Sequence, residues 1–201
     1  MTYLIVMMMT FPSSLALILK SNAPLNVSTI SDIGELFIDF SIEDFNKKLM
    51  NTFFSYKDVV FGNSLGLVSP VFRHCQENSV GSGCIDIEEI LAEKVTLKIK
   101  NIEKYEIHED FKLLKCQLDK LTRKRITLNV YYTPASSFGF PKHIDNHHVL
   151  IFQLHGKKIW ITSHGAYISS KNKKLFIPRG IAHQTRSSGD SLHLTVGLYD
   201  D

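Results

Sequence analysis

Three residues in the C-terminal half have the types and spacing of a metal site. His143 and Asp145 are separated by one residue, and His183 follows on a later segment with strand character. Residues two apart on a strand point to the same face, so one strand edge can present an imidazole and a carboxylate together. Two histidines and one carboxylate on one face of an octahedral ion form the facial triad of non-haem iron, which leaves positions open for other ligands. The pattern predicts a catalytic metal site at His143, Asp145 and His183.

The same residues also have plainer interpretations. An H-x-D pair occurs often by chance, and it is commonly a hydrogen-bonding pair on a surface. His147 and His148 follow closely, and seven of the nine histidines fall between His143 and His193. Such a cluster would also suit a zinc site. The spacing alone leaves these alternatives open.

Lys158 is a candidate for binding an anion inside a barrel. Strand alternation places Lys158, Trp160 and Thr162 on one face and Lys157 on the other. A barrel interior that holds a dicarboxylate needs a cation, and a charge-assisted hydrogen bond contributes more there than in water. The alternative is a solvated strand lysine like Lys157. We expect Trp160 to belong to the core.

Polar residues also alternate along two other predicted strands. Asn129, Tyr131 and Thr133 share one face, opposite apolar residues. That face would either line a ligand-binding interior or lie in solvent, and Tyr131 could bind the same anion as Lys158. His193 lies on the last predicted strand, where it would line the same interior or serve as a structural histidine.

The segments that carry these residues have the pattern of short strands. They are rich in β-branched and aromatic residues, and turn residues such as Pro134, Gly139 and Gly180 separate them. The predicted strands are Ile126–Tyr132, His148–Leu154, Lys157–Ser163, Lys174–Ile177, Ala182–Arg186 and Leu192–Tyr199. Many short strands at this spacing favour an all-β sandwich or barrel.

The earlier part of the chain has helical signals. Ser41 and Asp44 form a pair like a capping box, and 85–93 is helix-prone. Residues 95–99 alternate like a strand. Over 108–125, apolar residues recur at helical steps, which is typical of a helix packed on a sheet. These residues are Phe111, Leu114, Leu118 and Leu121. We therefore predict a mainly β fold with α, in which helical packing elements precede a β-barrel that begins near residue 125.

Composition favours a globular protein of a reducing compartment. Of the 201 residues, 44% are hydrophobic and 21% are charged, and the net charge of +3 is spread along the chain, so nothing indicates nucleic-acid binding. The three cysteines lack CxxC spacing, which argues against a disulfide framework and fits the cytoplasm, or the nucleus if the source is eukaryotic. The apolar run over 1–19 has no basic segment before it and is broken by Pro12. We expect it to be packed or weakly ordered, and not to span a membrane.

Four separated motifs together resemble a known family. They are NVYYTPASSFGFPKHID at 129–145, VLIFQLHGKKIW at 149–160, LFIPRGIAHQ at 175–184 and SLHLTV at 191–196. In this order they resemble the JmjC-type ribosomal oxygenases and their bacterial cupin-like relatives, over roughly residues 95–200. The resemblance implies a double-stranded β-helix of the cupin or jelly-roll type at 95–201, preceded by an N-terminal α/β packing region at 1–94.

The resemblance also implies cofactors and roles. It implies Fe(II), with its ligands at His143, Asp145 and His183, and 2-oxoglutarate as cosubstrate. The family's cation for the distal carboxylate of 2-oxoglutarate falls on Lys158. The family's Asn-x-Tyr-x-Thr-Pro strand falls on Asn129, Tyr131, Thr133 and Pro134.

The sequence departs from the family pattern in two places. The stretch between Ser163 and Leu175 is short, so we expect a barrel strand or a substrate loop to be missing there. The sequence stops at Asp201, directly after the last predicted strand. We therefore expect the family's helical dimerisation region to be absent.

The leading hypothesis is a 2-oxoglutarate-dependent dioxygenase that hydroxylates a side chain of a protein or peptide. Histidine or arginine of a ribosomal protein is the substrate class that the resemblance implies. Histone-lysine demethylation is less favoured, because no histone-binding module accompanies the domain. The alternatives are a hydroxylase of a small peptide or amino acid in a biosynthetic pathway, and a catalytically silent metal-binding cupin.

Overall fold

Two facing β-sheets form the body of the molecule. The computed structural model describes residues 41–68, 72–73, 81–122 and 124–200. The larger sheet has seven strands in the order β12 (Lys174–Ile177), β9 (His148–His155), β14 (Ser191–Tyr199), β7 (Arg125–Thr133), β6 (Thr96–Lys100), β2 (Val59–Asn63) and β3 (Gly66–Val68). The smaller sheet has the order β11 (Gly165–Ser170), β10 (Lys157–Thr162), β13 (Ala182–Arg186) and β8 (His143–Ile144). The mainly β barrel expected from the sequence is therefore confirmed.

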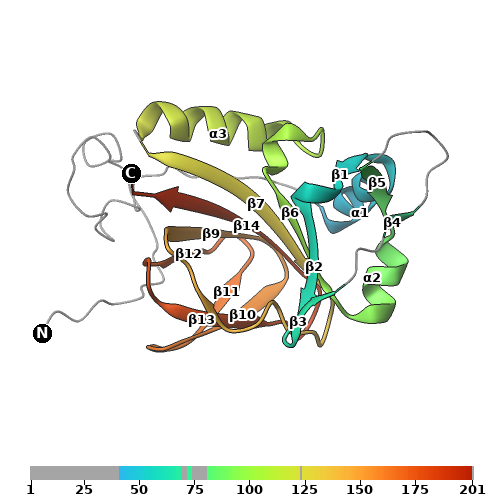
Figure 1. The fold of residues 1–201 in the computed structure, drawn as a ribbon. Coiled ribbons are helices and arrows are strands. Elements are labelled where there is room, and N and C mark those ends of the chain that lie inside the picture. Colours follow the sequence, from blue (N-terminus) through green and yellow to red (C-terminus); the bar gives the residue numbers. More distant parts are fainter. Residues whose placement is uncertain (1–40, 69–71, 74–80, 123, 201) are drawn as a thin grey trace, which may run out of the picture.

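Within the described residues, three α-helices lie outside this pair of sheets. They are α1 (Ile42–Asn51), α2 (Ile87–Glu93) and α3 (Glu109–Leu121). Figure 1 shows α3 on the face of the larger sheet that points away from the smaller one. The elements α1 and α2 lie at one end, beside a small sheet of β1 (Phe54–Ser55), β5 (Ser82–Ile85) and β4 (Phe72–Arg73), and two short 3-10 turns cover Tyr56–Asp58 and Ile102–Lys104.

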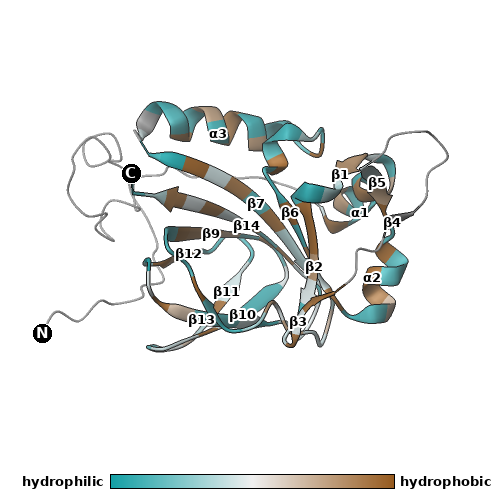
Figure 2. Ribbon diagram, viewed as in Figure 1, coloured by the Kyte–Doolittle hydropathy of each residue, from teal (hydrophilic) through white to brown (hydrophobic). Residues whose placement is uncertain are grey.

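The strand β14 is central to the larger sheet. It pairs with β7 along its whole length and with β9 on its other side. Its apolar residues, among them Leu194 and Val196, join Phe111 and Leu114 of α3 in the main core. Figure 2 shows the corresponding alternation of hydrophobic and hydrophilic residues along β7 and β14. Because residues two apart share a face, the polar residues of these strands point toward the smaller sheet.

The helix boundaries follow from their capping residues. The Ser41 hydroxyl accepts a hydrogen bond from the Asp44 backbone N–H at 2.9 Å and starts α1, as predicted. The helix predicted over 85–93 begins two residues later, because the Asp86 carboxylate caps it and Ile85 ends β5. The helix predicted over 108–125 ends at Leu121, because Thr122 is already extended and Arg125 opens β7.

The short stretch between Ser163 and Leu175 holds a strand. Residues Gly165–Ser170 form β11, which pairs with β10 along its entire length. The expectation of a missing barrel strand was therefore wrong, and the alternative of a missing substrate loop stays a prediction. A hydropathy pattern misplaces this strand because its apolar residues Ala166 and Ile168 are exposed, whereas its buried residue Ser169 is polar.

Segments on both sides of the predicted domain boundary share one sheet. The strand β2 pairs with β6, and β3 extends β2 at the sheet edge. Residues before 95 thus complete the larger sheet, and a boundary at 94 stays a prediction. The apolar run over 1–19 lies outside the described residues. Among the residues that the structure describes, no helix is both long and apolar enough to cross a membrane.

The central position of β14 predicts that removing one of its buried side chains lowers the free energy of unfolding. Leu194 is fully buried, so Leu194→Ala should lower the free energy of unfolding by about 2–5 kcal/mol. Urea unfolding would measure this. The matched control is Leu113→Ala on the exposed side of α3, which should change stability by less than about 0.5 kcal/mol. Equal effects of the two substitutions would contradict this packing.

Candidate metal centre and ligand pocket

The pairing of β8 with β13 brings the three predicted metal ligands together. His143 and His183 are direct partners in the antiparallel register, and Asp145 follows β8 immediately. The Nε2 atoms of His143 and His183 lie 3.9 Å and 3.5 Å from Asp145 Oδ2. One ligand atom from each residue lies within 4.8 Å of the others. The two imidazoles and the carboxylate therefore converge on one point.

The backbone orients both imidazoles. His143 Nδ1 lies 2.8 Å from the Pro141 carbonyl oxygen, and His183 Nδ1 lies 3.0 Å from the Ile181 carbonyl oxygen. Because a carbonyl oxygen can only accept a hydrogen bond, each Nδ1 carries a hydrogen and donates the bond. The lone pair of each Nε2 is then left for a metal. Burial lowers the pKa of His183 and so favours the neutral form that a metal requires. Adjacent corners of an octahedron with metal–ligand bonds near 2.1 Å are about 3 Å apart, so this donor set fits a divalent cation.

The ligand atoms face a cavity between the two sheets. Its volume is about 390 Å³. Four of the five residues predicted to bind the cosubstrate line it: Asn129, Tyr131, Lys158 and His193. The fifth, Thr133, is not part of the cavity wall but accepts a hydrogen bond from Lys158. The cavity wall also contains residues that the sequence analysis did not single out. These are Thr96, Lys98, Phe140, Gln184, Thr185 and Tyr199, among others.

Lys158 is a buried cation without a carboxylate. Its side chain is 1% exposed, whereas Lys157 is exposed, in agreement with strand alternation. Its Nζ donates to Thr133 Oγ1 at 2.7 Å and to His193 Nδ1 at 3.3 Å, and no ion pair to it occurs among the described residues. Burial lowers the pKa of Lys158 to about 7. A buried ammonium is costly without a counterion, so this arrangement is suited to an anion that enters the cavity.

His193 is held neutral between aromatic rings. Its ring stacks on Tyr131 at 4.8 Å between centroids and meets the edge of Trp160 at 5.3 Å. Burial, together with the charge of Lys158, lowers the pKa of His193 well below its usual value. A neutral imidazole can accept the hydrogen bond from Lys158. Trp160 is buried, as expected for a core residue, and its Nε1 donates to Ser169 Oγ at 3.0 Å.

The polar residues of β7 have distinct surroundings. Thr133 links Lys158 to Thr96, since the two threonine hydroxyl oxygens are 3.0 Å apart. Asn129 accepts a hydrogen bond from the Asn101 backbone at 3.4 Å. The Tyr131 ring stacks on His193, whereas the Lys158 ammonium bonds to Thr133 and His193, so the expected binding of the same anion by Tyr131 and Lys158 stays a prediction. Along β6, the polar residues Thr96 and Lys98 alternate with apolar residues. This alternation is the sequence signal that could have identified the two as residues of the cavity wall.

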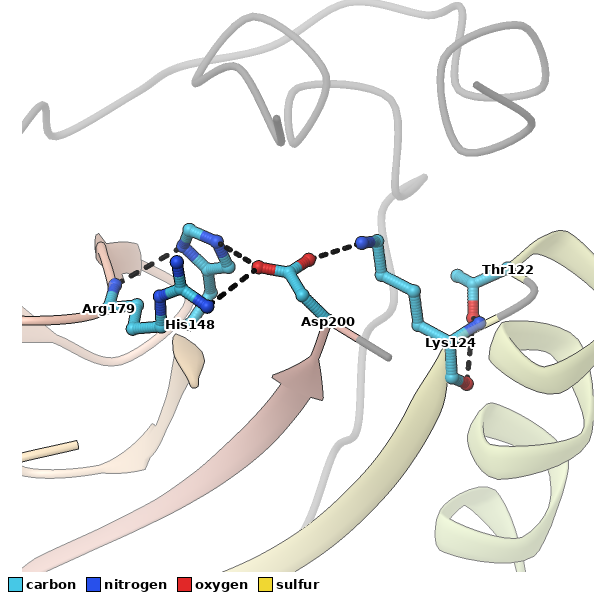
Figure 3. Close-up of polar contacts among 5 residues, drawn as sticks. All are labelled: Thr122, Lys124, His148, Arg179 and Asp200. Atoms are coloured by element: carbon cyan, nitrogen blue, oxygen red, sulfur yellow. Dashed lines mark hydrogen bonds and ion pairs between the residues drawn. The ribbon is translucent and has the colours of Figure 1, made fainter. Parts of the chain in front are cut away.

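A charged cluster around Asp200 holds the turn before β13 (Figure 3). The Asp200 carboxylate binds Lys124, and its Oδ2 lies 3.3 Å from His148 Nε2 and 3.7 Å from Arg179 Nη1. His148 Nδ1 accepts a hydrogen bond from the Arg179 backbone at 3.2 Å. The hydrogen bond from Lys124 lowers the pKa of Asp200, so the carboxylate stays charged. The cluster thereby connects the ends of β7, β9 and β14 to the turn that leads to His183.

Comparison with known proteins places these features in context. Residues 106–174 match the JmjC domain family. The bifunctional lysine-specific demethylase and histidyl-hydroxylase NO66 of Drosophila sechellia is 30% identical over a match that covers 37% of this chain and 16% of that protein. Ribosomal oxygenase 2 of Mus musculus is 32% identical, with 36% of this chain and 21% of that protein covered. The chain thus spans less than a quarter of the length of these relatives.

Solved structures show the same fold at low identity. The Escherichia coli ribosomal oxygenase YcfD superimposes with a TM-score of 0.58 and 18% identity, over 84% of this chain and 46% of that one. Another structure of YcfD, in complex with cobalt and 2-oxoglutarate, has a TM-score of 0.57 and 16% identity. The resemblance to JmjC-type oxygenases of the ribosomal oxygenase kind is therefore confirmed, as is the double-stranded β-helix fold.

The ligand set predicts the effect of removing one imidazole. His143→Ala should weaken Mn(II) binding by more than about 100-fold, since the loss of even an outer-shell partner costs 10- to 100-fold. Because the His143 side chain is 46% exposed, the metal-free variant should unfold at nearly the wild-type temperature. Electron paramagnetic resonance would count bound Mn(II). His164→Ala, in an exposed turn, is the control that should bind normally.

Four buried or half-buried histidines predict a loss of stability in acid. Burial is the largest cause that lowers the pKa of His147, His148, His183 and His193. The unfolded chain therefore takes up more protons than the folded one below a pH of about 6.5. The contribution of these histidines to the free energy of unfolding of the metal-free protein should be complete above that pH and should be lost as the pH drops below it.

Thermal melts at pH 7.5 and 5.5 would test this, and we expect a midpoint several degrees lower at pH 5.5. The variant His164→Gln, which replaces an exposed histidine, should show the same pH dependence as the wild type. A midpoint that rises on acidification would contradict the burial of these imidazoles.

Proposed function

We propose that this chain, which carries a JmjC-type domain, is an Fe(II)- and 2-oxoglutarate-dependent oxygenase that hydroxylates a side chain of a protein or peptide. The observation that carries the proposal is the pairing of two features in one cavity. A converging His–Asp–His set faces it from β8 and β13, and the uncompensated cation of Lys158 faces it from β10. A metal-binding cupin without a diacid ligand would have no need for that cation.

The protein's part in this reaction is binding and orientation. When bound, Fe(II) and 2-oxoglutarate supply the activation of O2 and the oxidising power for hydroxylation. His143, Asp145 and His183 hold the metal from one side and leave the other side open to the cavity. Lys158 binds the distal carboxylate of the cosubstrate, and the Thr133 hydroxyl and neutral His193 hold the ammonium in place.

Burial around this pocket strengthens both the binding of the metal and the binding of the carboxylate by Lys158. Trp160 and Val149 are buried apolar residues of the cavity wall. They give part of the cavity an apolar wall, and charge pairs are stronger beside apolar groups than in water. The lowered pKa of Lys158 describes the empty pocket, and a bound carboxylate would raise it again.

The substrate class is inferred from the relatives. Proteins similar to this chain are named as a histidyl-hydroxylase and as ribosomal oxygenases. Their names support a protein substrate, with histidine or arginine of a ribosomal protein as the first class to test. A search for proteins that gain one oxygen atom, in cells with and without this chain, would identify the substrate directly.

Substitution of Lys158 tests the cosubstrate separately from the metal. Lys158→Ala should weaken 2-oxoglutarate binding about 10- to 100-fold, since hydrogen bonds to charged groups contribute about 1.5–3 kcal/mol. Mn(II) binding should be nearly unchanged, because Lys158 is not a ligand. Lys158→Arg should keep part of the affinity, because it retains the charge with a different geometry. Anaerobic calorimetry would measure both affinities, and succinate release would measure turnover.

Lys157→Ala is the matched control, because Lys157 is the neighbour of Lys158 on β10 and its side chain is exposed. It should bind 2-oxoglutarate like the wild type. If Lys157 and Lys158 prove equally dispensable, the cosubstrate assignment fails. Metal binding without any succinate release would then favour a catalytically silent cupin.

A further inference from the structure

A second lysine faces the cavity from the larger sheet. In the strand register, Lys98 of β6 lies opposite Tyr131 of β7, and Tyr131 lies opposite His193 of β14. Lys98 shares its face with Thr96, which bonds to Thr133 inside the barrel. Its Nζ lies 5.2 Å from the centre of the Tyr131 ring. Lys98 is therefore a cavity residue and not a solvated strand lysine.

Lys98 carries a positive charge that is not held in a direct ion pair by the described residues. No carboxylate forms an ion pair with it within the described parts of the chain. Burial lowers the pKa of Lys98, but Tyr131 and Asp145 outweigh this effect and raise the pKa overall. The side chain is thus cationic at neutral pH. Asp145 is the acidic group of the cavity wall, and it already serves the metal site.

The cosubstrate does not account for this second charge. With Fe(II), the Asp145 ligand, dianionic 2-oxoglutarate and Lys158, the formal charges of the proposed site balance. Lys158 is fixed by Thr133 and His193, and His193 lies two strands from Lys98, a separation of about 10 Å. Lys98 therefore adds one positive charge to a different part of the same cavity.

The surroundings of Lys98 suit an acidic side chain. Val60 and Phe140 line the cavity, and the Phe140 ring meets Tyr131 edge-on at 6.0 Å. An apolar wall beside one cation accommodates methylene groups that end in a carboxylate. A substrate guanidinium would instead meet a like charge, which destabilises binding.

We infer that Lys98 is a specificity-determining residue that binds a carboxylate of the substrate, so that the segment entering the cavity presents aspartate or glutamate and not arginine. This inference rests on the proposed function. It narrows the protein or peptide side chain of that function to an acidic one, and it argues against the arginine that was named there as a first class to test. It also separates the roles of the two lysines, with Lys158 serving the cosubstrate and Lys98 the substrate.

Peptide binding to a redox-inactive complex tests the inference. The probes are capped Gly-Gly-X-Gly-Gly peptides in which X is Asp, Glu, Asn, Gln, His or Arg, titrated into the protein loaded with Zn(II) and 2-oxoglutarate. Calorimetry should show that the better acidic peptide binds at least about 10-fold more tightly than its amide counterpart, as expected for a charge-assisted hydrogen bond. Lys98→Met should abolish this difference, and Lys98→Glu should shift the preference toward Arg.

The matched control is Lys100→Met, two residues farther along β6, opposite Asn129. It should keep the wild-type preference. Equal binding of the amide, His or Arg peptides by the wild type would overturn the inference, and so would an acidic preference that survives in Lys98→Met. Weakened 2-oxoglutarate binding in Lys98→Met would assign Lys98 to the cosubstrate and also overturn it.

Titration of 2-oxoglutarate before any peptide is added distinguishes the two proposals. If the wild type fails to bind it, the proposed function fails, and the peptide series on the Zn(II) protein alone still tests Lys98. If the wild type binds it but does not prefer acidic peptides, only the inference on Lys98 fails.

Discussion

The buried ammonium of Lys158 is the constraint around which the cavity is organised. An ammonium removed from water needs hydrogen-bond acceptors and a counterion. The acceptors come from the larger sheet, as the Thr133 hydroxyl and the neutral His193 imidazole. The ammonium itself comes from the smaller sheet. The two sheets therefore meet through this group, and an apolar residue at position 158 would leave Thr133 and His193 facing an empty apolar space.

The metal site illustrates how far local sequence patterns extend. The H-x-D spacing of His143 and Asp145 marked one half of the site, and the turn ending at Gly180 placed His183 near a strand start. Strand pairing set the rest, because the register of β8 against β13 makes His143 and His183 direct neighbours. β8 has only two residues, which is too short for a periodic pattern to predict a strand. The strand assignments elsewhere were predictable because their alternation was long and regular.

Other features depend on contacts between distant segments. Lys98 lies on a strand recognised from alternation, but only its place beside β7 shows that it faces the cavity. Asp200 is an ordinary terminal acid in sequence, and it becomes a link among three strands through Lys124, His148 and Arg179. The strand β11 was missed because its apolar residues are exposed and its buried residue Ser169 is polar, the reverse of the usual hydropathy pattern. Each of these omissions reflects information carried by the tertiary arrangement.

The position of β14 has a consequence for the order of events during synthesis. It is the last strand in the sequence of the described residues, yet it lies between β7 and β9, which have no direct pairing with each other. Until the ribosome has released β14, the larger sheet remains in two unconnected pieces, and His193 is not available to Lys158. Pairing over such long sequence separations is slow to form. The pocket between the two sheets is therefore completed only after β14 has been synthesised.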